Sequence, residues 1–391
     1  MISFEKAALY IGDLTLPLKT QRVDLMQALN RVIAEDVVSD TDIPPFDKSA
    51  MDGFACRKED LQNALKVIEE IPAGKVPEKT IGANQCARIM TGATVPHGAD
   101  VVIQLEHAEE ISPGIIRRIQ ESSSSNICLA GEDVQKGDVV IHKGEEVKPQ
   151  HIAVLATAGI TRPLVYSPYT IGVISTGSEL TEPWEIPGKS KIRNSNAWQL
   201  MAQATILGYQ PDYLGIVPDR EDALISVLSD VITRYDILVI SGGVSVGDYD
   251  YVPGVLKQIG AEIIFHGLDA KPGKHLLFAR TKNTLIFGLP GNPVSSFVQF
   301  ELLIKPLLLK LRGVLKKPET RKVIMDGAYF RKKSDVLSFI PGRLIGQEHV
   351  SALEYHGSAH IHAYRLANCI IEIPKGVHQI KKGELVNVRP I

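Results

Sequence analysis

The chain has 391 residues, of which 44% are hydrophobic and 23% are charged, and its formal net charge is −2. This composition is typical of a folded globular protein, and the length predicts roughly two to four domains. A nearly neutral chain has no general attraction for nucleic acid or for an anionic membrane, so any anion-binding site must be local.

The sequence also argues against secretion and membrane insertion. The four cysteines are scattered without metal-ligand spacing, as is usual in a reducing compartment. The N-terminus has no basic stretch followed by an apolar run, and the most apolar segment, residues 302–311, is too short and too interrupted to span a bilayer. We therefore expect a cytoplasmic protein with neither a membrane nor a nucleic-acid partner.

The first part of the chain is predicted to combine helix with a small β domain. Up to about Asp42, apolar residues recur near helical spacing, and residues 42–47 break that pattern with two prolines. Short apolar runs between Gly- and Pro-containing turns predict strands within residues 50–145. Helical spacing returns at residues 148–159.

Strands alternate with helices in the next part of the chain. Strand-like runs occupy residues 169–174, 213–217, 236–240, 261–265 and 284–287. Helical patterns occupy residues 196–207 and 293–311, and Pro306 is expected to bend the second of these helices. A further helix is expected after the strand at residues 213–217, with Asp219 as its cap. The alternation predicts a parallel sheet with helices on both faces, and strand-like runs after residue 318 predict a second small β domain.

The predicted fold is therefore α/β, with a central doubly wound α/β domain flanked by two small β domains and a helical or extended linker segment. We expect the segments to be residues 1–45 with 146–167 (linker), 46–145 (β domain), 168–315 (α/β domain) and 316–391 (C-terminal β-barrel).

Three loops after the α/β strands contain unusual residues, at the edge where open α/β sheets bind ligands. In residues 241–250, three glycines permit positive φ, and successive N–H groups can form an anion-binding nest. Lys271 and Lys274 bracket a Pro-Gly turn and could face one oxyanion. Residues 288–295 lead into a helix with free N–H groups at its start. Taken alone, the first loop could be a plain strand-to-helix turn, the second a solvated surface turn, and the third an ordinary helix cap.

Three carboxylates are expected beside these loops. Glu179, Asp219 and Asp250 follow successive strands of the predicted sheet. Loops at the carboxyl ends of parallel strands emerge at one edge, and oxygen ligands beside an anion site suit Mg²⁺ that bridges phosphate. Each carboxylate alone is better explained as a cap or a surface charge, so the prediction depends on their shared placement.

Residues 243–247 also match the GxSxG pattern of serine hydrolases, which leaves a second function open. That pattern requires a helix directly behind the serine, whereas Pro253 indicates that the next helix starts several residues later. Histidines lie downstream, at His275 and His356, so a Ser-Asp-His order is available. The sequence has neither a GxGxxG nor a GxxxxGK[ST] motif, which argues against dinucleotide and P-loop chemistry.

Over almost its whole length, the sequence resembles the molybdopterin molybdenumtransferases, which include the E domain of gephyrin. The matching stretches are residues 45–53, 89–93, 131–133, 175–180, 241–250, 271–274, 288–295, 341–343 and 357–358. The resemblance implies a homodimer, dimerisation through the linker segment, and an α/β domain like that of molybdopterin-binding adenylyltransferases. It also implies a cleft between this domain of one subunit and the first β domain of the other.

The activity implied by the resemblance is molybdenum insertion, the last general step of molybdenum cofactor biosynthesis. Adenylyl-molybdopterin and molybdate would give molybdenum cofactor and AMP, with Mg²⁺ or a similar divalent cation. A molybdopterin adenylyltransferase and acceptor molybdoenzymes would be the partners. A catalytically silent scaffold of the same fold is a third alternative, although retention of both lysines and both aspartates favours catalysis.

The resemblance also assigns roles to residues. The residues implied to be catalytic are Asp52, Asp219, Asp250, Lys271 and Lys274, and the implied metal ligands are Asp219, Asp250, Glu179 and Asp133. The residues implied to bind the substrates are Thr91, Ser241, Gly242, Gly243, Ser245, Gly247, Pro290, Gly291, Asn292, Pro293, Ser295, Arg343 and Ser358. The molybdate site among these would be Lys271, Lys274, Ser295, Arg343 and Ser358.

Two positions depart from the family pattern. Ser178 stands where members often have Asp, and Cys128 stands where they often have Arg. Both departures remove a charge near the expected cleft.

Overall fold

The computed structural model describes residues 1–245, 247, 250–314 and 319–391, which divide into two compact units. Unit 1 contains residues 1–21, 30–32 and 165–391, and unit 2 contains residues 22–29 and 33–164. The predicted boundary between residues 315 and 316 lies outside the described residues. The division of the chain into four segments stays a prediction.

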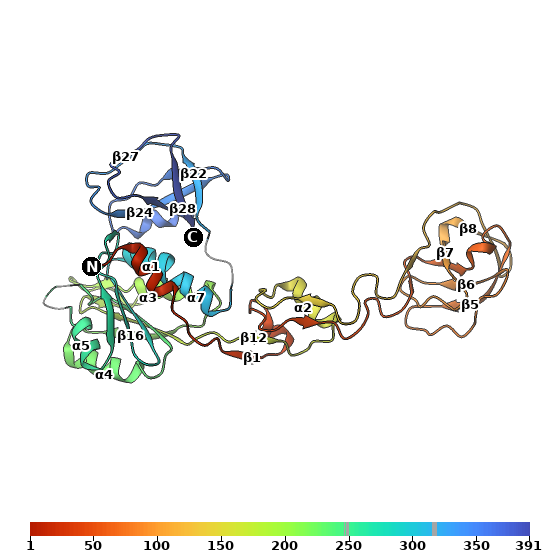
Figure 1. Ribbon diagram of the computed structural model, residues 1–391, viewed down its shortest axis with the longest axis horizontal. Helices are drawn as coiled ribbons and strands as arrows, with labels where there is room; N and C mark the ends of the chain where they lie inside the picture. Colours follow the sequence, from red (N-terminus) through yellow and green to blue (C-terminus); the bar gives the residue numbers. More distant parts are fainter. Residues whose placement is uncertain (246, 248–249, 315–318) are drawn as a thin grey trace. The chain divides into compact units, whose positions relative to one another are not determined.

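Unit 1 is built around a six-stranded sheet in the order β16-β13-β17-β21-β20-β18. Its edge strand β16 is labelled in Figure 1. The strands are β13 (Ile171–Thr176), β16 (Asp212–Val217), β17 (Ile237–Ser241), β18 (Glu262–His266), β20 (Leu277–Arg280) and β21 (Leu285–Leu289). β16, β13, β17 and β21 are parallel, whereas β20 is antiparallel to both of its neighbours. The prediction of a parallel sheet is therefore confirmed for β16, β13, β17 and β21, whereas β20 is an antiparallel strand that the sequence pattern did not predict.

Helices cover both faces of this sheet because alternate residues of its buried strands enter different cores. Ile237 and Val239 of β17 pack in one core, whereas Leu238 and Ile240 pack in the other. The first core includes α1 (Phe4–Gly12), α3 (Asn196–Ile206), α6 (Pro293–Gln299) and α7 (Lys305–Leu311). The second includes α4 (Glu221–Val231) and α5 (Val252–Gln258). A strand buried on both faces is a continuous apolar run, which is why β17 could be predicted.

The predicted helix over residues 293–311 contains a π-helical turn. The run is helical throughout, but Phe300–Ile304 forms this turn between α6 and α7. The π-helical turn ends two residues before Pro306, which has no N–H for the helical hydrogen-bond pattern.

The helical prediction for the first 42 residues is wrong beyond α1. Residues Leu25–Ala28 form only a single 3-10 turn, and Asn30 then has a left-handed φ of 60°. The apolar residues of this segment are buried without a helix, since Val32 and Ile33 are almost fully inaccessible in extended backbone. The prediction for residues 148–159 is confirmed by α2 (Pro149–Thr157).

The C-terminal part of unit 1 is a small closed barrel. Its strands are β22 (Arg321–Met325), β24 (Leu337–Ile345), β25 (His349–Ala352), β26 (Cys369–Ile373) and β28 (Leu385–Pro390), and a pairing of β24 with β26 closes the circle. The short strands β23 (Tyr329–Phe330) and β27 (Gln379–Ile380) pair beside it. β19 (Ala270–Lys271) pairs with β24 in parallel, so Lys271 lies opposite Ser338. This pairing connects the predicted lysine loop directly to the barrel.

Unit 2 contains the strands predicted within residues 50–145. Its six-stranded sheet consists, in order, of β7 (Val101–Gln104), β4 (Gly53–Cys56), β6 (Gln85–Ile89), β5 (Leu65–Ile71), β9 (Ile115–Arg118) and β8 (Ala108–Ser112). The shorter pairs are β3 (Lys48–Ser49) with β10 (Ile127–Cys128), and β2 (Val37–Val38) with β11 (Val139–Ile141). Apolar side chains from alternate positions of this sheet pack in separate cores, with Phe54 and Cys56 in one and Ala55 in another.

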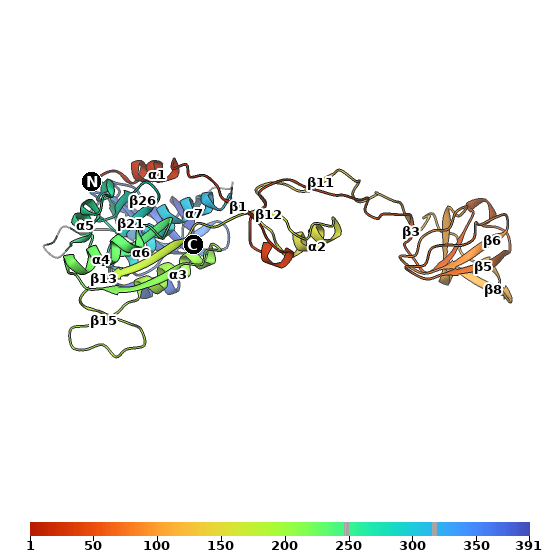
Figure 2. The same ribbon diagram turned by 90° about the horizontal axis from the view of Figure 1, so that it is seen from below.

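Figure 2 shows a long connection extending from unit 1 beside the label β15. It joins β14 (Leu180–Thr181) to β15 (Ile192–Arg193), which are parallel to each other. Among the described residues, no helix is both long and apolar enough to cross a membrane.

Candidate active site

Asp219 is fixed by the loop that follows β13. Its carboxylate accepts hydrogen bonds from the Thr176 hydroxyl at 2.5 Å and from the Ser178 backbone N–H at 3.0 Å. In return, the Asp219 N–H donates to Ser178 Oγ at 3.1 Å. The expectation that Asp219 caps α4 is wrong, because Arg220 occupies the cap position and the carboxylate points to the neighbouring loop instead.

The glycine-rich loop after β17 is closed by Asp250. Gly242 and Gly243 have φ angles of 98° and 63°, in the left-handed region that favours glycine. The Asp250 carboxylate accepts hydrogen bonds from the N–H groups of Ser245 and Gly247, each at 2.9 Å. Positions 246, 248 and 249 of this predicted motif lie outside the described residues.

These two loops line one cavity of about 630 Å³, which we call the carboxylate cavity. It brings together three carboxylates that are far apart in sequence: Glu179, Asp219 and Asp250. The other predicted site residues in its lining are Ser241, Gly242, Gly243, Gly291, Asn292 and Pro293. Ser245 and Gly247 do not line it, but their N–H groups orient Asp250.

A second cavity, of about 430 Å³, contains the predicted lysines, and we call it the lysine cavity. Its lining includes Lys271, Lys274, Ser295, Ser358 and Pro290 from the predicted set. No Asp or Glu occurs among the described residues that line it, whereas Arg331 and Lys333 add two further cationic side chains. The cavity is therefore cationic, although Lys271 Nζ also lies 3.7 Å from exposed Asp335.

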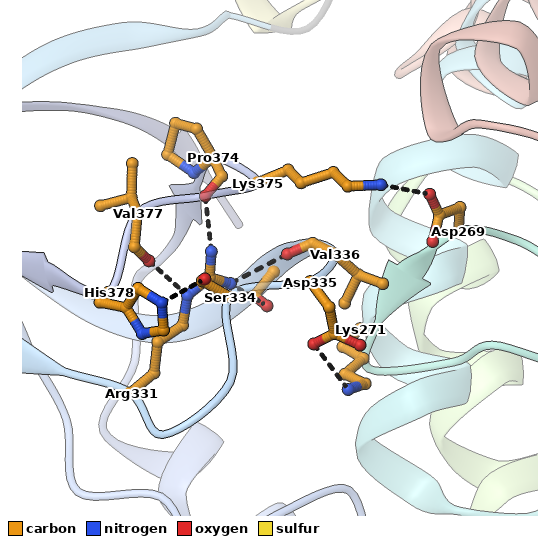
Figure 3. Close-up of polar contacts among 11 residues, drawn as sticks. Asp269, Lys271, Arg331, Ser334, Asp335, Val336, Pro374, Lys375, Val377 and His378 are labelled. Atoms are coloured by element: carbon orange, nitrogen blue, oxygen red, sulfur yellow. Dashed lines mark hydrogen bonds and ion pairs between the residues drawn. The ribbon is translucent and has the colours of Figure 1, made fainter.

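Hydrogen bonds hold the lysine loop and the barrel segment beside it, and Figure 3 shows those of Arg331 together with the contact of Lys271 with Asp335. Gly273 has a φ of 101°, and the Gln299 side chain of α6 donates to its carbonyl. Arg331 is 8% exposed and donates to Ser338 Oγ at 2.6 Å and to three backbone carbonyls of the barrel. Burial lowers the pKa of the Arg331 guanidinium below its usual value. Its main contacts are therefore within the barrel.

Asn292 lines both cavities and so marks where they adjoin. It occupies the N-cap position of α6 but makes no side-chain capping bond, contrary to the ordinary explanation of this residue. Its Nδ2 donates instead to Ser358 Oγ at 3.0 Å, and the Val294 N–H donates to the Ser358 carbonyl at 3.0 Å. These bonds place a barrel residue beside the loop of the α/β sheet.

Arg343 is not among the residues that line either cavity. It is exposed on β24, where its register partner is Ser351. Its implied role at molybdate stays a prediction that this geometry does not support.

The remaining predicted residues belong to unit 2. Asp52 Oδ1 accepts hydrogen bonds from the hydroxyl and the N–H of Thr91, at 2.6 and 2.7 Å. The side-chain bond, followed by the backbone bond, lowers the pKa of Asp52. Asp133 is exposed, and a hydrogen bond with Glu132 raises the pKa of the nearby Cys128 thiol. The participation of Asp52, Thr91 and Asp133 in a common site stays a prediction.

The loop around Ser245 lacks the geometry of a hydrolase nucleophile elbow. α5 begins at Val252, seven residues after Ser245, and the described residues between them, Gly247, Asp250 and Tyr251, are not helical. Among the described residues, no histidine is hydrogen-bonded to Ser245, and His266 instead contacts the Val244 carbonyl at 2.7 Å. The structure gives the hydrolase alternative no support.

Comparison with known proteins gives matches over nearly the whole chain. A molybdopterin molybdenumtransferase from Staphylococcus aureus strain Mu50 is 37% identical over 378 residues, covering 94% of this chain and 90% of that protein. One from Staphylococcus epidermidis is 36% identical over an alignment of 399 residues, covering 99% of this chain and 95% of that protein. The chain belongs to the molybdopterin molybdenumtransferase family.

Structural and domain-level matches agree with membership of the molybdopterin molybdenumtransferase family. A crystal structure of a molybdopterin biosynthesis MoeA protein from Pyrococcus horikoshii has a TM-score of 0.86 and 30% identity, covering 100% of this chain and 99% of that chain. Family models match residues 2–159 (MoeA N-terminal region, domains I and II), 172–310 (probable molybdopterin binding domain) and 327–391 (MoeA C-terminal region, domain IV).

Several lining residues of this molybdenumtransferase family member had no sequence signal. Asn196 of α3 donates to Ser241 Oγ and to the Gly291 carbonyl, both at 2.8 Å, and so ties two of the predicted loops together. Arg193 and His362 also line the carboxylate cavity. These residues belong to no sequence motif, so their place in the cavity is known only from their neighbours in the folded structure. The missed residues of the lysine cavity include His275, Tyr329, Arg331, Lys333 and Tyr355.

Proposed function

We propose that this protein inserts molybdenum: it converts adenylyl-molybdopterin and molybdate into molybdenum cofactor and AMP. The main support is a pair of adjoining cavities of opposite chemistry, one with Lys271 and Lys274 and the other with Asp219 and Asp250. The curated relatives carry the name of this activity. Neither a hydrolase nor a scaffold would require a cationic cavity next to a carboxylate cavity.

The lysine cavity suits molybdate, which is a tetrahedral oxyanion with two negative charges. Ammonium groups and hydroxyls are the donors that such an anion requires, and the cavity offers Lys271, Lys274, Ser295 and Ser358. Ser295 is 2% exposed, so its hydroxyl faces little competing water. The absence of acidic side chains among the described lining residues avoids repulsion of the anion.

The carboxylate cavity suits the phosphoanhydride that joins the two halves of the substrate. Mg²⁺ is commonly bound by one or two carboxylates together with substrate phosphates, so Asp219 and Asp250 fit a shared ion. The described residues contain no group of three His, Cys, Asp or Glu side chains arranged around a metal, so phosphate oxygens would complete the coordination. When bound, Mg²⁺ would offset charge on the phosphate that leaves with AMP.

Positioning is the main contribution of the surrounding residues. Thr176 and Ser178 orient Asp219, and the N–H groups of Ser245 and Gly247 orient Asp250, so neither carboxylate must reorganise during the reaction. Because the cavities meet at Asn292, the anhydride and the molybdate would be held close together, which raises their effective concentration.

The proposal has further parts that rest on the family. We include a homodimer, delivery of substrate by a molybdopterin adenylyltransferase, transfer to acceptor molybdoenzymes, and action in the cytoplasm. Asp52, Thr91 and Asp133 of unit 2 would complete the substrate site, and Glu179 would support the metal. Of these, Glu179 has support in its place in the carboxylate cavity.

Reconstitution tests the proposal. Purified protein is mixed with adenylyl-molybdopterin, molybdate and Mg²⁺, and both AMP release and activation of a molybdoenzyme apoprotein are measured. We expect both signals to require molybdate. In Lys271→Ala and Lys274→Ala the KM for molybdate should rise by about 10- to 100-fold, the usual effect of losing a charge-assisted hydrogen bond.

Lys282→Ala is the matched control, because Lys282 is exposed between β20 and β21 and lines neither cavity. Its KM for molybdate should equal that of the wild type. Activity that is unchanged in Lys271→Ala, Lys274→Ala and Asp250→Ala would contradict the proposed roles.

A further inference from the structure

The two tryptophans of the chain lie together on the surface of unit 1. The sequence contains only Trp184 and Trp198, and their side chains are 69% and 41% exposed. Their ring centroids are 6.0 Å apart and the planes are inclined at 80°, so the rings form a corner rather than a stack. Apolar side chains that form a contiguous exposed patch, unlike singly exposed ones, can mark a ligand or partner site.

This corner is part of a cavity of about 510 Å³ that adjoins the carboxylate cavity. Its lining is Pro183, Trp184, Arg193, Asn194, Ser195 and Trp198, and we call it the tryptophan cavity. Arg193, Asn194 and Ser195 also line the carboxylate cavity. The three cavities therefore form a series, in which Asn292 joins the first two and residues 193–195 join the last two.

The wall between these cavities is held rigidly from behind. Asn194 Nδ2 donates to the Tyr213 hydroxyl at 3.0 Å, and this hydroxyl donates to Glu182 Oε1 at 2.6 Å. Tyr213 also packs against Trp198, with ring centroids 5.3 Å apart. Burial, followed by the hydrogen bond to Glu182, raises the pKa of Tyr213, so its hydroxyl stays protonated as a donor.

The loop that carries Trp184 is also held in place. The Glu185 carboxylate accepts hydrogen bonds from the Thr181 hydroxyl and from the Glu182 N–H. Arg193 Nε donates to the Glu185 carbonyl at 3.1 Å. The ring of Trp184 is thus presented by a fixed turn, next to a guanidinium that lines both cavities.

The order of the cavities matches the order of groups in the proposed substrate. In adenylyl-molybdopterin the dithiolene, which receives molybdenum, lies between the pterin and the phosphoanhydride, and the adenosine follows the anhydride. With molybdate in the lysine cavity and the anhydride in the carboxylate cavity, the next cavity in the series would meet the adenosine. The pterin would extend from the opposite side of the dithiolene.

We propose that Trp184 and Trp198 bind the adenine ring of adenylyl-molybdopterin, with Arg193 beside the adenylyl phosphate; this rests on the function proposed above. A flat heteroaromatic ring can stack on one indole while its edge meets the other, an arrangement that near-perpendicular rings favour. Arg193 supplies the cation that a phosphate between two carboxylates requires.

Intrinsic fluorescence of the full-length protein tests this inference, because both tryptophans belong to the tryptophan cavity. AMP with Mg²⁺ should quench the emission saturably. Pyrophosphate should not quench it, and a simple pterin should neither quench it nor displace AMP. By equilibrium dialysis, Trp184→Ala should raise the Kd for AMP about tenfold, as expected for loss of base–aromatic stacking, whereas Trp184→Phe should largely preserve it.

Ile186→Ala is the control in the same loop, since Ile186 is 91% exposed and does not line the cavity. Its Kd for AMP should equal that of the wild type. The inference is overturned if AMP causes no quenching, if pterin competes with AMP, or if Trp184→Ala binds AMP normally. It is also overturned if Trp184→Ala changes only the molecular mass in solution, which would assign the tryptophans to an interface between copies.

The reconstitution assay separates this inference from the function on which it rests. If AMP release requires molybdate but Trp184→Ala leaves the KM for adenylyl-molybdopterin unchanged, only the adenine site is wrong. If AMP binding depends on Trp184 but no molybdenum is inserted, only the proposed function is wrong.

Discussion

Asp219 shows how a single carboxylate can be prepared for a reaction by its neighbours. One oxygen accepts from the Thr176 hydroxyl and the other from the Ser178 N–H. Ser178 returns a bond through its hydroxyl, which accepts from the Asp219 N–H. An aspartate at position 178 could accept the same bond but would add a second negative charge beside Asp219. Serine at position 178 therefore accepts this hydrogen bond without adding a negative charge beside Asp219.

Asp219→Asn should lower kcat of AMP release by roughly 100-fold, as expected for loss of one prepositioned charged group. The KM for molybdate should change little, because the oxyanion would be held by the lysine cavity. Steady-state rates measured at varied molybdate separate the two constants. Asp230→Asn is the control, since Asp230 of α4 pairs with Arg234 beyond the end of the helix and lines neither cavity. A rise in the molybdate KM with unchanged kcat would contradict this role for Asp219.

His275 in the lysine cavity gives a pH-dependent prediction. Burial, and then the charges of Lys274 and His266, lower the pKa of His275 below its ordinary value of 6.5, while Asp250 opposes this shift. The folded protein therefore keeps the imidazole neutral at a pH where the unfolded chain already binds a proton. As the pH falls from about 6.5 through the lowered pKa, the free energy of unfolding should decrease.

Urea unfolding at pH 7.5 and pH 5.5 measures this effect. The wild type should lose more stability on acidification than His275→Gln, because only the wild type has this imidazole to protonate. Equal losses in both proteins would show that other groups cause the pH dependence.

At the scale of elements, the loop after β17 depends on its glycines. A Cβ atom at Gly242 would lie 2.2 Å from the Thr176 carbonyl oxygen, and the φ of 98° disfavours any side chain. This loop passes the neighbouring strand closely, which allows it to line the carboxylate cavity. Gly254 lies within α5, and a Cβ atom there would meet nothing within 4 Å.

Gly242→Ala should lower the free energy of unfolding by about 2–4 kcal/mol, through strain and a direct clash. Gly254→Ala should change it by no more than about 1 kcal/mol, in the stabilising direction, because alanine favours helix. Urea unfolding followed by tryptophan fluorescence is suitable, since both tryptophans lie in unit 1. Similar stabilities for the two variants would contradict the close approach at Gly242.

Elements with a strong hydrophobic pattern could be predicted from the sequence. Elements whose structure depends on contacts with other segments could not. β17 is a continuous apolar run because both of its faces are buried. The segment around Val23 had helical spacing, but its apolar residues are buried by neighbouring segments without forming a long helix. β20 was not predicted, because no local sequence pattern distinguishes a strand that runs antiparallel to its neighbours. Arg343 was chosen by its motif, whereas Arg331 lines the cavity through barrel contacts.

At the scale of the whole molecule, the lysine cavity is assembled from distant parts of the chain. The β19–β24 pairing brings Lys271 beside the barrel, and the Asn292–Ser358 hydrogen bond fixes a second point of contact. The sequence allowed the individual motifs to be recognised, but the adjoining of two cavities at Asn292 is a property of the folded unit. Side chains that act only through such assembly, such as Asn196, have no sequence signature.

The proposed homodimer predicts a solution mass of twice the 42.8 kDa of one chain. Size-exclusion chromatography with light scattering measures this mass directly. A mass of one chain that persists at high protein concentration would contradict the dimer while leaving the arrangement of the two cavities unaffected.

The central claim is that the lysine cavity holds molybdate next to the carboxylates. Crystals grown with molybdate and measured at the molybdenum absorption edge test it most directly. We predict one anomalous peak within hydrogen-bonding distance of Lys271 and Lys274, close to Ser295 and Ser358 and displaced from Asp219 and Asp250. An ordered molybdate elsewhere, with the lysine cavity unoccupied, would contradict the account.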